Sequence, residues 1–317
     1  MRHPTRVRRS LAAVVAIGTA VALSGCGSDA EGGSEGSLTL GFVNGDNSGF
    51  SSCLQKSVER TAKARGVELF VSNSQMDPAK ELSDIENMIT RGVDALIVQT
   101  VNVDALEGDI AKAKSAKVPI FLTSVATDDV GAVLGAAVVD LPRLGALDAE
   151  WVAKDAAGRP VEVGVIAGAP GAASDLMVGG FVDALPANAK VVANQPGMFS
   201  PVKAQDVAEN MIQGHPDLDY VFVANEEMAF AARKVFDAAG ARDIRIVTEN
   251  GTDEGLAAVA DGRFSATVAN SPRVIGETAV NNTVALLADP TSAAKIADIP
   301  LSLITKENLD QAPSYCS

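Results

Sequence analysis

The sequence predicts an α/β protein built from two doubly wound, parallel-sheet lobes. Short apolar, β-prone segments alternate with amphipathic helical segments, and the connections between them are a few residues long. This alternation runs twice along the chain, and the two runs meet near residues 137–140, which indicates two similar lobes. Residues 220–240 show the repeating unit, with a buried strand (YVFV), a polar turn beginning at Asn225, and a helix that ends at Gly240.

The individual elements follow from apolar periodicity and from helix start and stop signals. In the first run, strands are expected at residues 38–43, 67–71, 95–98 and 119–122, and helices at residues 50–65, 78–91 and 103–116. Gly66 stops the first of these helices and Pro78 begins the second. In the second run, besides the helix after Asn225, helices are expected at residues 141–157, 176–185, 202–213, 254–260 and 276–287. Strands are expected there at residues 161–166, 191–194, 220–223, 244–247, 266–269 and 301–304.

The first 25 residues have the pattern of a secretory signal peptide. Four arginines precede an apolar run over residues 11–23, which is short for a membrane span. The ending LSGC resembles a bacterial lipobox, in which Cys26 is diacylated and becomes the new N-terminus; an ordinary signal peptide with an incidental cysteine is the alternative. Residues 26–37 are rich in Gly, Ser and acidic residues, which predicts a flexible tether.

Charge and composition argue against several function classes. Signal cleavage removes four of the 26 basic residues and none of the 40 acidic ones, leaving 22 against 40, a net charge of −18. Such a chain is a poor candidate for nucleic acid, because phosphates are bound by Lys and Arg. His215, at a predicted helix end, is then the only histidine, which argues against a His/Cys metal site. No G-x-S-x-G elbow follows a predicted strand, and residues 168–171 (GAPG) lack the Lys-Ser/Thr of a phosphate loop, so neither an enzyme nor a cofactor is indicated.

Two cysteines remain besides Cys26. In an exported protein Cys53 and Cys316 can form a disulfide, which would tie the start of the first helix to the C-terminus. Sequence does not give the distance between them, so two free thiols are the alternative.

Three segments spread over the mature chain carry a resemblance to a known family. They are residues 74–82 (SQMDPAKEL), 221–229 (VFVANEEMA) and 261–269 (DGRFSATVA). From residue 38 to about residue 309 the chain resembles the ribose-binding-protein-like branch of type 1 periplasmic solute-binding proteins, the receptors of ABC-type sugar importers. Sugar-responsive repressors share this fold but carry an N-terminal helix-turn-helix, where this chain has a signal peptide.

The resemblance implies two lobes that are joined by three hinge crossings and close on a ligand held between them. One lobe would comprise residues 38–139 and 271–300, the other residues 140–270 and 301–309, with residues 310–317 as a tail. The implied partners are a small-molecule ligand and an ABC permease. We expect a monomer without a cofactor or a metal, exported and held on the outer face of the cytoplasmic membrane by its lipid anchor alone.

Carried over position by position, the resemblance places eight residues in the cleft: Ser48, Phe50, Ser124, Met177, Phe199, Asn225, Asn250 and Asn270. The two phenylalanines match places where family members stack an aromatic ring on a sugar face; packing in the core is the alternative. The three asparagines each lie at or just beyond the end of a predicted strand, where ligands collect in open α/β sheets. For Asn225, the alternative is that it only caps the helix that follows it.

The cleft departs from the ribose-type pattern in its charges. Residues 124–125 (Ser-Val) replace an Asp-Arg pair, Met177 replaces an arginine, and Asn250 stands where aspartate is common. The remaining groups are neutral, which favours a polyol, a less polar sugar or another small neutral metabolite over ribose. Glu249 and Asp175 would select an amine-bearing ligand if they faced the cleft. Alternation along the strand predicts instead that Glu249 points away from the Asn250 side.

Together these observations predict an extracytoplasmic solute-binding lipoprotein that hands a small polar ligand to an ABC importer. A sensing subunit, which presents its closed form to a membrane signalling receptor, is the alternative. An extracellular hydrolase on the same scaffold is a third class, and no motif in the chain favours it.

Overall fold

The computed structural model of the protein describes residues 37–127 and 129–316. The predicted signal peptide, Cys26 and all but the last residue of the predicted tether lie outside the described residues. None of the helices within these ranges combines the length and the apolar character needed to cross a membrane.

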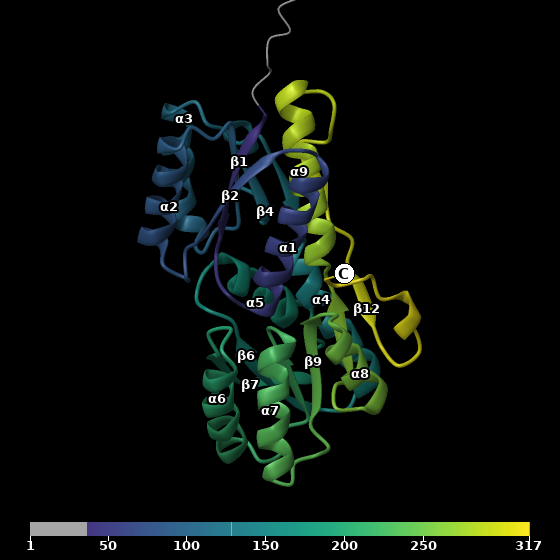
Figure 1. Cartoon of the computed structure of the whole chain (residues 1–317). Coiled ribbons are helices and arrows are strands. Elements are labelled where there is room, and N and C mark those ends of the chain that lie inside the picture. The colour runs from purple at the N-terminus through teal and green to yellow at the C-terminus, as the bar shows by residue number, and fades with distance from the viewer. Residues whose placement is uncertain (1–36, 128, 317) are drawn as a thin grey trace, which may run out of the picture. The chain divides into compact units, whose positions relative to one another are not determined.

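The first sheet has the strand order β11-β5-β4-β3-β1-β2, and every neighbouring pair is parallel. Its strands are β1 (Thr39–Asn44), β2 (Glu68–Asn73), β3 (Ala95–Val98), β4 (Ile120–Ser124), β5 (Gly135–Val138) and β11 (Ile296–Asp298). Helices α2 (Pro78–Thr90) and α3 (Val103–Ser115) lie together on one side of this sheet, and α1 (Gly49–Ala64) and α9 (Pro272–Ala288) pack against each other on the other side (Figure 1).

The second sheet has the order β12-β10-β9-β8-β6-β7. Its strands are β6 (Val161–Ala167), β7 (Ala189–Pro196), β8 (Tyr220–Val223), β9 (Arg245–Asn250), β10 (Ala266–Ala269) and β12 (Ser302–Ile304). The helices that belong to it are α4 (Leu141–Ala156), α5 (Ala172–Ala184), α6 (Pro201–Gly214), α7 (Glu226–Ala238) and α8 (Asp253–Asp261). All of its strand pairs are parallel except that β12 runs antiparallel to β10 at the edge.

We call the first sheet with α1, α2, α3 and α9 the N-lobe, and the second sheet with α4 to α8 the C-lobe. The chain passes between the lobes three times, between β5 and α4, between β10 and α9, and between β11 and β12. The predicted α/β class with two lobes built on parallel sheets is confirmed. In each lobe the carboxyl ends of parallel strands lie along one edge of the sheet, which is where such folds bind ligands.

Several predicted elements need correction. No element was predicted over residues 135–138 or 296–298, which form β5 and β11. Both strands are very short, and β5 (GAAV) is made mostly of small residues with low β propensity, so neither had a strand pattern. Helix α5 begins at Ala172 instead of residue 176, and α9 begins at Pro272 instead of residue 276. The signal for α9 was the pair Ser271-Pro272, an N-cap followed by proline in the first turn.

Helices α4 and α5 of the C-lobe touch backbone to backbone. A Cβ atom at Gly145 of α4 would collide with the carbonyl oxygen of Met177 on α5, and one at Gly180 of α5 would collide with the carbonyl of Pro142 on α4. Glycine is therefore required at both positions for this spacing. The contact fixes the position of α5, and with it the position of the Met177 side chain.

Candidate binding cleft

A cavity of about 130 Å³ lies between the N-lobe and the C-lobe, at the carboxyl ends of the strands of both sheets. All eight residues predicted for the cleft line it: Ser48, Phe50, Ser124, Met177, Phe199, Asn225, Asn250 and Asn270. The structure thus brings together residues that lie up to 222 positions apart in the sequence. Their role in binding a ligand stays a prediction, and the geometry below says what each can offer.

The N-lobe wall is formed by loops that follow β1, β3 and β4. Ser48 is the N-cap of α1, and its Oγ accepts a hydrogen bond from the Ser51 amide at 3.3 Å. Ser124 ends β4 with a φ of 68°, and its Oγ is buried without a hydrogen-bond partner in the described structure. A buried hydroxyl in this state has donor and acceptor capacity left for a ligand.

Two aromatic rings line the cavity from opposite lobes. Phe50 lies in the first turn of α1, and Phe199 lies in the turn between β7 and α6 with a φ of 51°. The Phe199 ring packs against Gly168, where a Cβ atom would collide with it. The glycine-containing loop 168–171 therefore makes room for an aromatic side chain, which explains its composition without a phosphate ligand. Rings facing a cavity can pack on the apolar C–H face of a sugar.

Three asparagines lie at the ends of three neighbouring C-lobe strands. Asn225 follows β8, Asn250 ends β9 and Asn270 follows β10, and these strands are adjacent in the sheet. Asn225 does both things that the sequence offered as alternatives. Its Oδ1 accepts from the Met228 amide at 2.8 Å as the N-cap of α7, and the residue also lines the cavity. The amide nitrogen is then the group that Asn225 can offer to a ligand.

Glu249 also lines the cavity, so the prediction that it points away from the Asn250 side is wrong. The reason is the backbone of Asn250, whose φ of 135° breaks the alternation of side chains at the end of β9. Asp175, the other acidic candidate, is exposed and outside the lining, while its neighbour Ser174 is buried and within it. The sequence predicted neutral groups in the cavity wall, but the structure adds the acidic side chain of Glu249 to it.

The Glu249 carboxylate lies among amide donors. Asn270 Nδ2 donates to Glu249 Oε2 at 2.9 Å. Asn250 is hydrogen-bonded to the Tyr315 hydroxyl at 2.8 Å. The orientation of the Asn250 amide that suits all of its neighbours turns its oxygen toward Tyr315 and its nitrogen toward both Glu249 carboxylate oxygens, each 2.7 Å away. One side chain of the C-terminal segment thus helps to orient the cavity wall.

Burial has the largest effect on the pKa of the Glu249 carboxyl group. It raises the pKa of Glu249 well above its ordinary value, and the nearby Glu226 carboxylate raises it further, against the lowering effect of Asn270. Behind it lies Asp148 of α4, which is fully buried and has a pKa raised by burial and by Glu249. Burial likewise raises the pKa of Glu226, although donors from Gly251, Thr252 and Thr267 oppose the shift.

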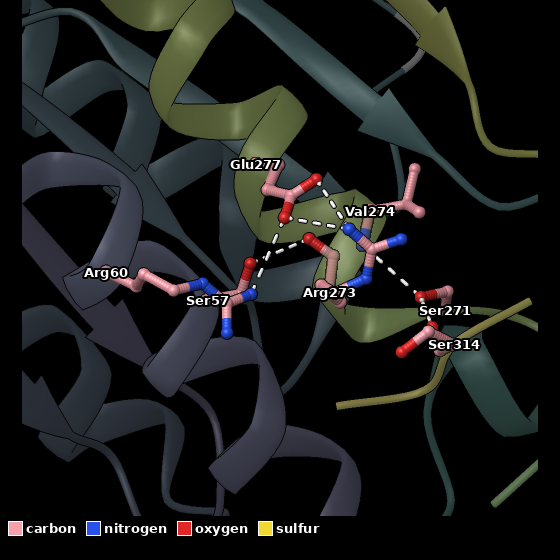
Figure 2. Close-up of polar contacts among 7 residues, drawn as sticks. All are labelled: Ser57, Arg60, Ser271, Arg273, Val274, Glu277 and Ser314. Atoms are coloured by element: carbon pink, nitrogen blue, oxygen red, sulfur yellow. Dashed lines mark hydrogen bonds and ion pairs between the residues drawn. The ribbon is translucent and has the colours of Figure 1, made fainter. Parts of the chain in front are cut away.

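The C-terminal segment that carries Tyr315 is held in place at several points. Cys53 of α1 and Cys316 form a disulfide, with their Cα atoms 5.1 Å apart. Ser271 Oγ donates to the carbonyl of Ser314 at 2.6 Å (Figure 2). The Arg273 amide donates to the Tyr315 carbonyl at 3.3 Å. Predicting the role of this segment needed the three-dimensional structure, because its sequence (PSYC) has no motif.

The start of α9, on which that segment rests, is itself bonded to α1. Ser57 Oγ of α1 donates to the Arg273 carbonyl at 2.7 Å (Figure 2). Glu277 of α9 accepts from Arg273 at 2.9 Å and from Arg60 of α1 at 3.5 Å. Exposed ion pairs of this kind contribute little energy, so the disulfide and the hydrogen bonds carry the attachment.

The two lobes are also hydrogen-bonded across the mouth of the cleft. Glu227, in the first turn of α7, accepts from the Gly49 amide at the start of α1 at 2.9 Å. A carboxylate is stabilised at a helix N-terminus by unpaired amides and by the helix dipole. Because the acceptor and the donor belong to different lobes, this bond exists only while the lobes are close together.

Further lining residues were not predicted from the sequence. Gln99, Thr100 and Val101 follow β3 and enter the cavity, and Asp46 does so after β1. Their common signal is their position directly after a strand of the parallel sheet. Glu81 of α2 holds this loop, accepting from Thr100 Oγ1 and from the Val101 amide, each at 2.7 Å.

A bound metal ion would require a cluster of side chains that can act as its ligands. Within residues 37–127 and 129–316, no group of three or more His, Cys, Asp or Glu side chains is arranged to hold a metal ion.

Comparison with known proteins gives concordant matches. A family model described as "Periplasmic binding protein domain" matches residues 40–291. The ribose import binding protein RbsB of Bacillus subtilis (strain 168) is 32% identical over 231 residues, covering 72% of this chain and 75% of the relative. The xylitol-binding protein of Mycolicibacterium smegmatis is 27% identical, covering 80% and 72%.

Solved structures agree with these matches. The periplasmic binding protein component of the arabinose ABC transporter from Shewanella sp. ANA-3, bound to α- and β-L-arabinofuranose, superposes with a TM-score of 0.80 at 28% identity. The superposition covers 86% of this chain and 94% of that one. A Mycobacterium smegmatis protein in complex with β-D-fucofuranose gives a TM-score of 0.81 at 27% identity, covering 87% and 93%.

Proposed function

Because the chain belongs to the periplasmic binding protein family, in its ribose-binding-protein-like branch, we propose that it captures a sugar or polyol between its lobes and delivers it to an ABC importer. Proteins of this family are extracytoplasmic solute-binding proteins and not enzymes. Relatives named for ribose and xylitol, and the solved structure that has L-arabinofuranose bound, support a polyhydroxylated ligand.

The observation that carries the proposal is the make-up of the cavity wall. Amides at the ends of three adjacent C-lobe strands and two phenylalanine rings, one from each lobe, line the same cavity. Amides and hydroxyls bond the hydroxyl groups of a sugar or polyol, because they donate and accept. A ring can cover the apolar face of the ligand. A ligand that contacts both lobes at once favours closure through its higher affinity for the closed state.

Three finer features belong to the same proposal. The lobes, residues 38–139 with 271–300 and residues 140–270 with 301–309, move as units about the three crossings. Lipid on Cys26 anchors the protein to the outer face of the cytoplasmic membrane. The protein acts as a monomer toward the importer's permease. Fractionation of cells that produce the Cys26→Ser variant tests the anchor, since retention of this variant in the membrane fraction would contradict it.

A thermal-shift screen of sugars, alditols and cyclitols tests the function directly. A ligand present at 100 times its Kd stabilises the native state by about 2.7 kcal/mol, which for a domain of this size raises the Tm by roughly 5–10 °C. Amino acids and simple diols serve as negative controls. If no sugar or polyol shifts the Tm while a member of the control set does, the proposed ligand class is wrong.

A further inference from the structure

The cavity has an unusual balance of charge for a site that binds neutral ligands. Two charged side chains, Asp46 and Glu249, belong to its described lining, and both are acidic. The same lining contains no Lys, Arg or His. The half-buried Asp46 is engaged through Oδ1, which accepts from the Ser48 amide at 2.7 Å. Glu249 is the deeper of the two, with only 6% of its surface exposed.

The hydrogen bonds around Glu249 are those of an acceptor. Both amides beside it, Asn250 and Asn270, turn their nitrogens toward its carboxyl oxygens. A carboxylate accepts such bonds with all of its lone pairs, whereas a carboxylic acid must donate its proton to an acceptor. Among the described residues no cationic side chain pairs with Glu249. The protein therefore supplies polar donors to the carboxylate but no positive charge.

The surroundings of Glu249 increase the need for a counter-charge. The Glu226 carboxylate, which accepts from Gly251, Thr252 and Thr267, adds negative potential at Glu249. Asp148 has no exposed surface, and neither of its carboxyl oxygens has a hydrogen-bond partner in the described structure. A buried carboxylate without a counter-charge is costly, and a cation in contact with it removes much of that cost.

The atoms left unsatisfied in the cavity wall also call for a donor. Asn270 is 5% exposed and lines the cavity, and its Oδ1 has no partner in the described structure. Together with Glu249 it offers acceptors on neighbouring strand ends. An ammonium group brings three donors and one positive charge, and therefore complements both acceptors at once.

We propose that this cavity takes a polyhydroxylated ligand that carries one ammonium group, such as an amino sugar, amino alditol or aminocyclitol, with the Glu249 carboxylate as its counter-ion. This proposal rests on the proposed function and narrows its ligand class. Hydroxyl groups of the ligand bond the asparagine amides, its C–H face packs against the phenylalanines, and its ammonium group lies between Glu249 and the Asn270 oxygen. On this proposal the ligand carries one positive charge, whereas the sequence predicted a neutral ligand.

Matched ligand pairs test the proposal on the wild-type protein. Each pair has one carbon skeleton with an amine or a hydroxyl at one position: glucosamine and glucose, 1-amino-1-deoxyribitol and ribitol, and scyllo-inosamine and scyllo-inositol. Isothermal titration calorimetry at pH 7 should show the amine of at least one pair binding about tenfold or more tightly than its hydroxyl partner. Because an ammonium favours the charged form of Glu249, the amine should also release up to about one proton, visible as a dependence of the heat on the buffer.

The Glu249→Gln variant tests whether the Glu249 carboxylate causes the preference for the amine. This variant should reduce the affinity for the preferred amine by about tenfold or more beyond any loss shown by its hydroxyl partner, and it should abolish the proton release. Glu254→Gln, which removes one negative charge from the exposed first turn of α8, is the matched control and should change neither.

The outcomes separate this inference from the function on which it rests. Binding of the hydroxyl members as tightly as the amines, or an amine preference that persists in Glu249→Gln, overturns the ammonium proposal and leaves a sugar or polyol receptor. Absence of binding by every sugar, alditol and cyclitol, amine or not, overturns the proposed function and the inference together.

Discussion

At the scale of single residues, the cleft is built from side chains that hold the fold and face the ligand at the same time. Asn225 caps α7 with its oxygen and offers its nitrogen to the cavity. Ser48 caps α1 and lines the same space. A substitution at such a position changes stability and affinity together, so the two effects have to be separated by the choice of replacement.

Two replacements of Asn225 separate its roles. Asn225→Ala removes both groups, and we expect it to cost about 1 kcal/mol of unfolding free energy through the lost cap. Its ligand affinity should fall by about tenfold or more through the lost hydrogen bond. Asn225→Ser keeps a capping oxygen but not the amide nitrogen, so it should lose the affinity and retain most of the stability. Chemical denaturation and calorimetry measure the two quantities, and unchanged affinity in the serine variant would restrict Asn225 to capping.

At the scale of elements, the C-terminal segment acts as a support for the cavity wall. Its disulfide to α1 and its hydrogen bonds to α9 hold Tyr315 against Asn250, whose φ of 135° is a strained value for a residue other than glycine. Asn250 in turn donates to Glu249. The Cys53–Cys316 disulfide, which joins α1 of the N-lobe to the C-terminal segment, therefore helps to position the Asn250 amide in the C-lobe wall of the cavity.

Removing the disulfide should affect both stability and binding. We expect the Cys53→Ser/Cys316→Ser double variant to lose about 3 kcal/mol of unfolding free energy, because the unfolded chain is no longer cross-linked. Its ligand affinity should also fall, since Tyr315 is held less firmly. Tyr315→Phe is the control that keeps the disulfide. It should reproduce a loss of affinity of about threefold to tenfold while retaining most of the stability. Unchanged affinity in both variants would show that the segment does not support the cavity.

At the scale of the whole molecule, closure and stability depend on acidic groups that lie between elements. Glu227 joins the lobes at the mouth of the cleft, and Glu81 joins α2 to the loop after β3. Each of these carboxylates accepts from backbone amides of another element. These hydrogen bonds therefore stabilise the packing of one element against another more than they stabilise any single helix.

Loss of the Glu227 contact should favour opening of the cleft. The hydrogen bond to the Gly49 amide is made only with the lobes together, so Glu227→Ala should lower ligand affinity by about tenfold without changing the cavity wall. Small-angle scattering of the unliganded protein should show a larger mean radius of gyration than wild type. The exposed Glu254→Ala variant is the control for a lost negative charge, and equal affinities in the two variants would contradict an interlobe role for Glu227.

The stability of the unliganded protein should fall as the pH rises through the range set by Glu81. Burial is the largest influence on this carboxyl and raises its pKa from 4.5 to about 7. The folded state then holds the proton more tightly than the unfolded state. The contribution is therefore fully present below about pH 4.5 and is lost as the pH rises to about 7, with a total near 3 kcal/mol.

Comparison with Glu81→Gln isolates this effect from that of the other carboxyls. Urea denaturation between pH 4.5 and 8 should give a shallower fall in unfolding free energy for the variant than for the wild type. Parallel curves for the two proteins would assign the pH dependence to other groups. Asp109, whose raised pKa is likewise caused by burial, lies beside Glu81 and shares the titration.

Much of this organisation was available in the sequence. Strands such as YVFV at residues 220–223, followed by a capping asparagine and a periodic helix, are recognisable because the local pattern and the tertiary environment agree. The position of a residue directly after a strand was also enough to place Asn225, Asn250 and Asn270 at one edge of a sheet. These features depend on residues that are close together in the sequence, so sequence patterns are enough to predict them.

Features that depend on contacts between distant segments could not be predicted in the same way. The direction of the Glu249 side chain was predicted wrongly because side chains alternate only along a regular strand backbone. Asn250, with a φ of 135°, does not have that backbone conformation. Tyr315 has no sequence signal for its contact with Asn250, since the partners are 65 residues apart. The strand β5, made of small residues, forms because neighbouring strands pair with it and not because its own sequence favours a strand.

The backbone contact between α4 and α5 restricts how this receptor can change during evolution. With glycines at the crossing, a larger residue at position 145 or 180 would force the two helices apart and displace Met177 from the cavity. The lineage can therefore acquire a new ligand preference by exchanging the side chain at position 177, whereas gradual tilting of α5 is blocked. Mutational libraries that aim at altered recognition should vary position 177 and leave both glycines in place.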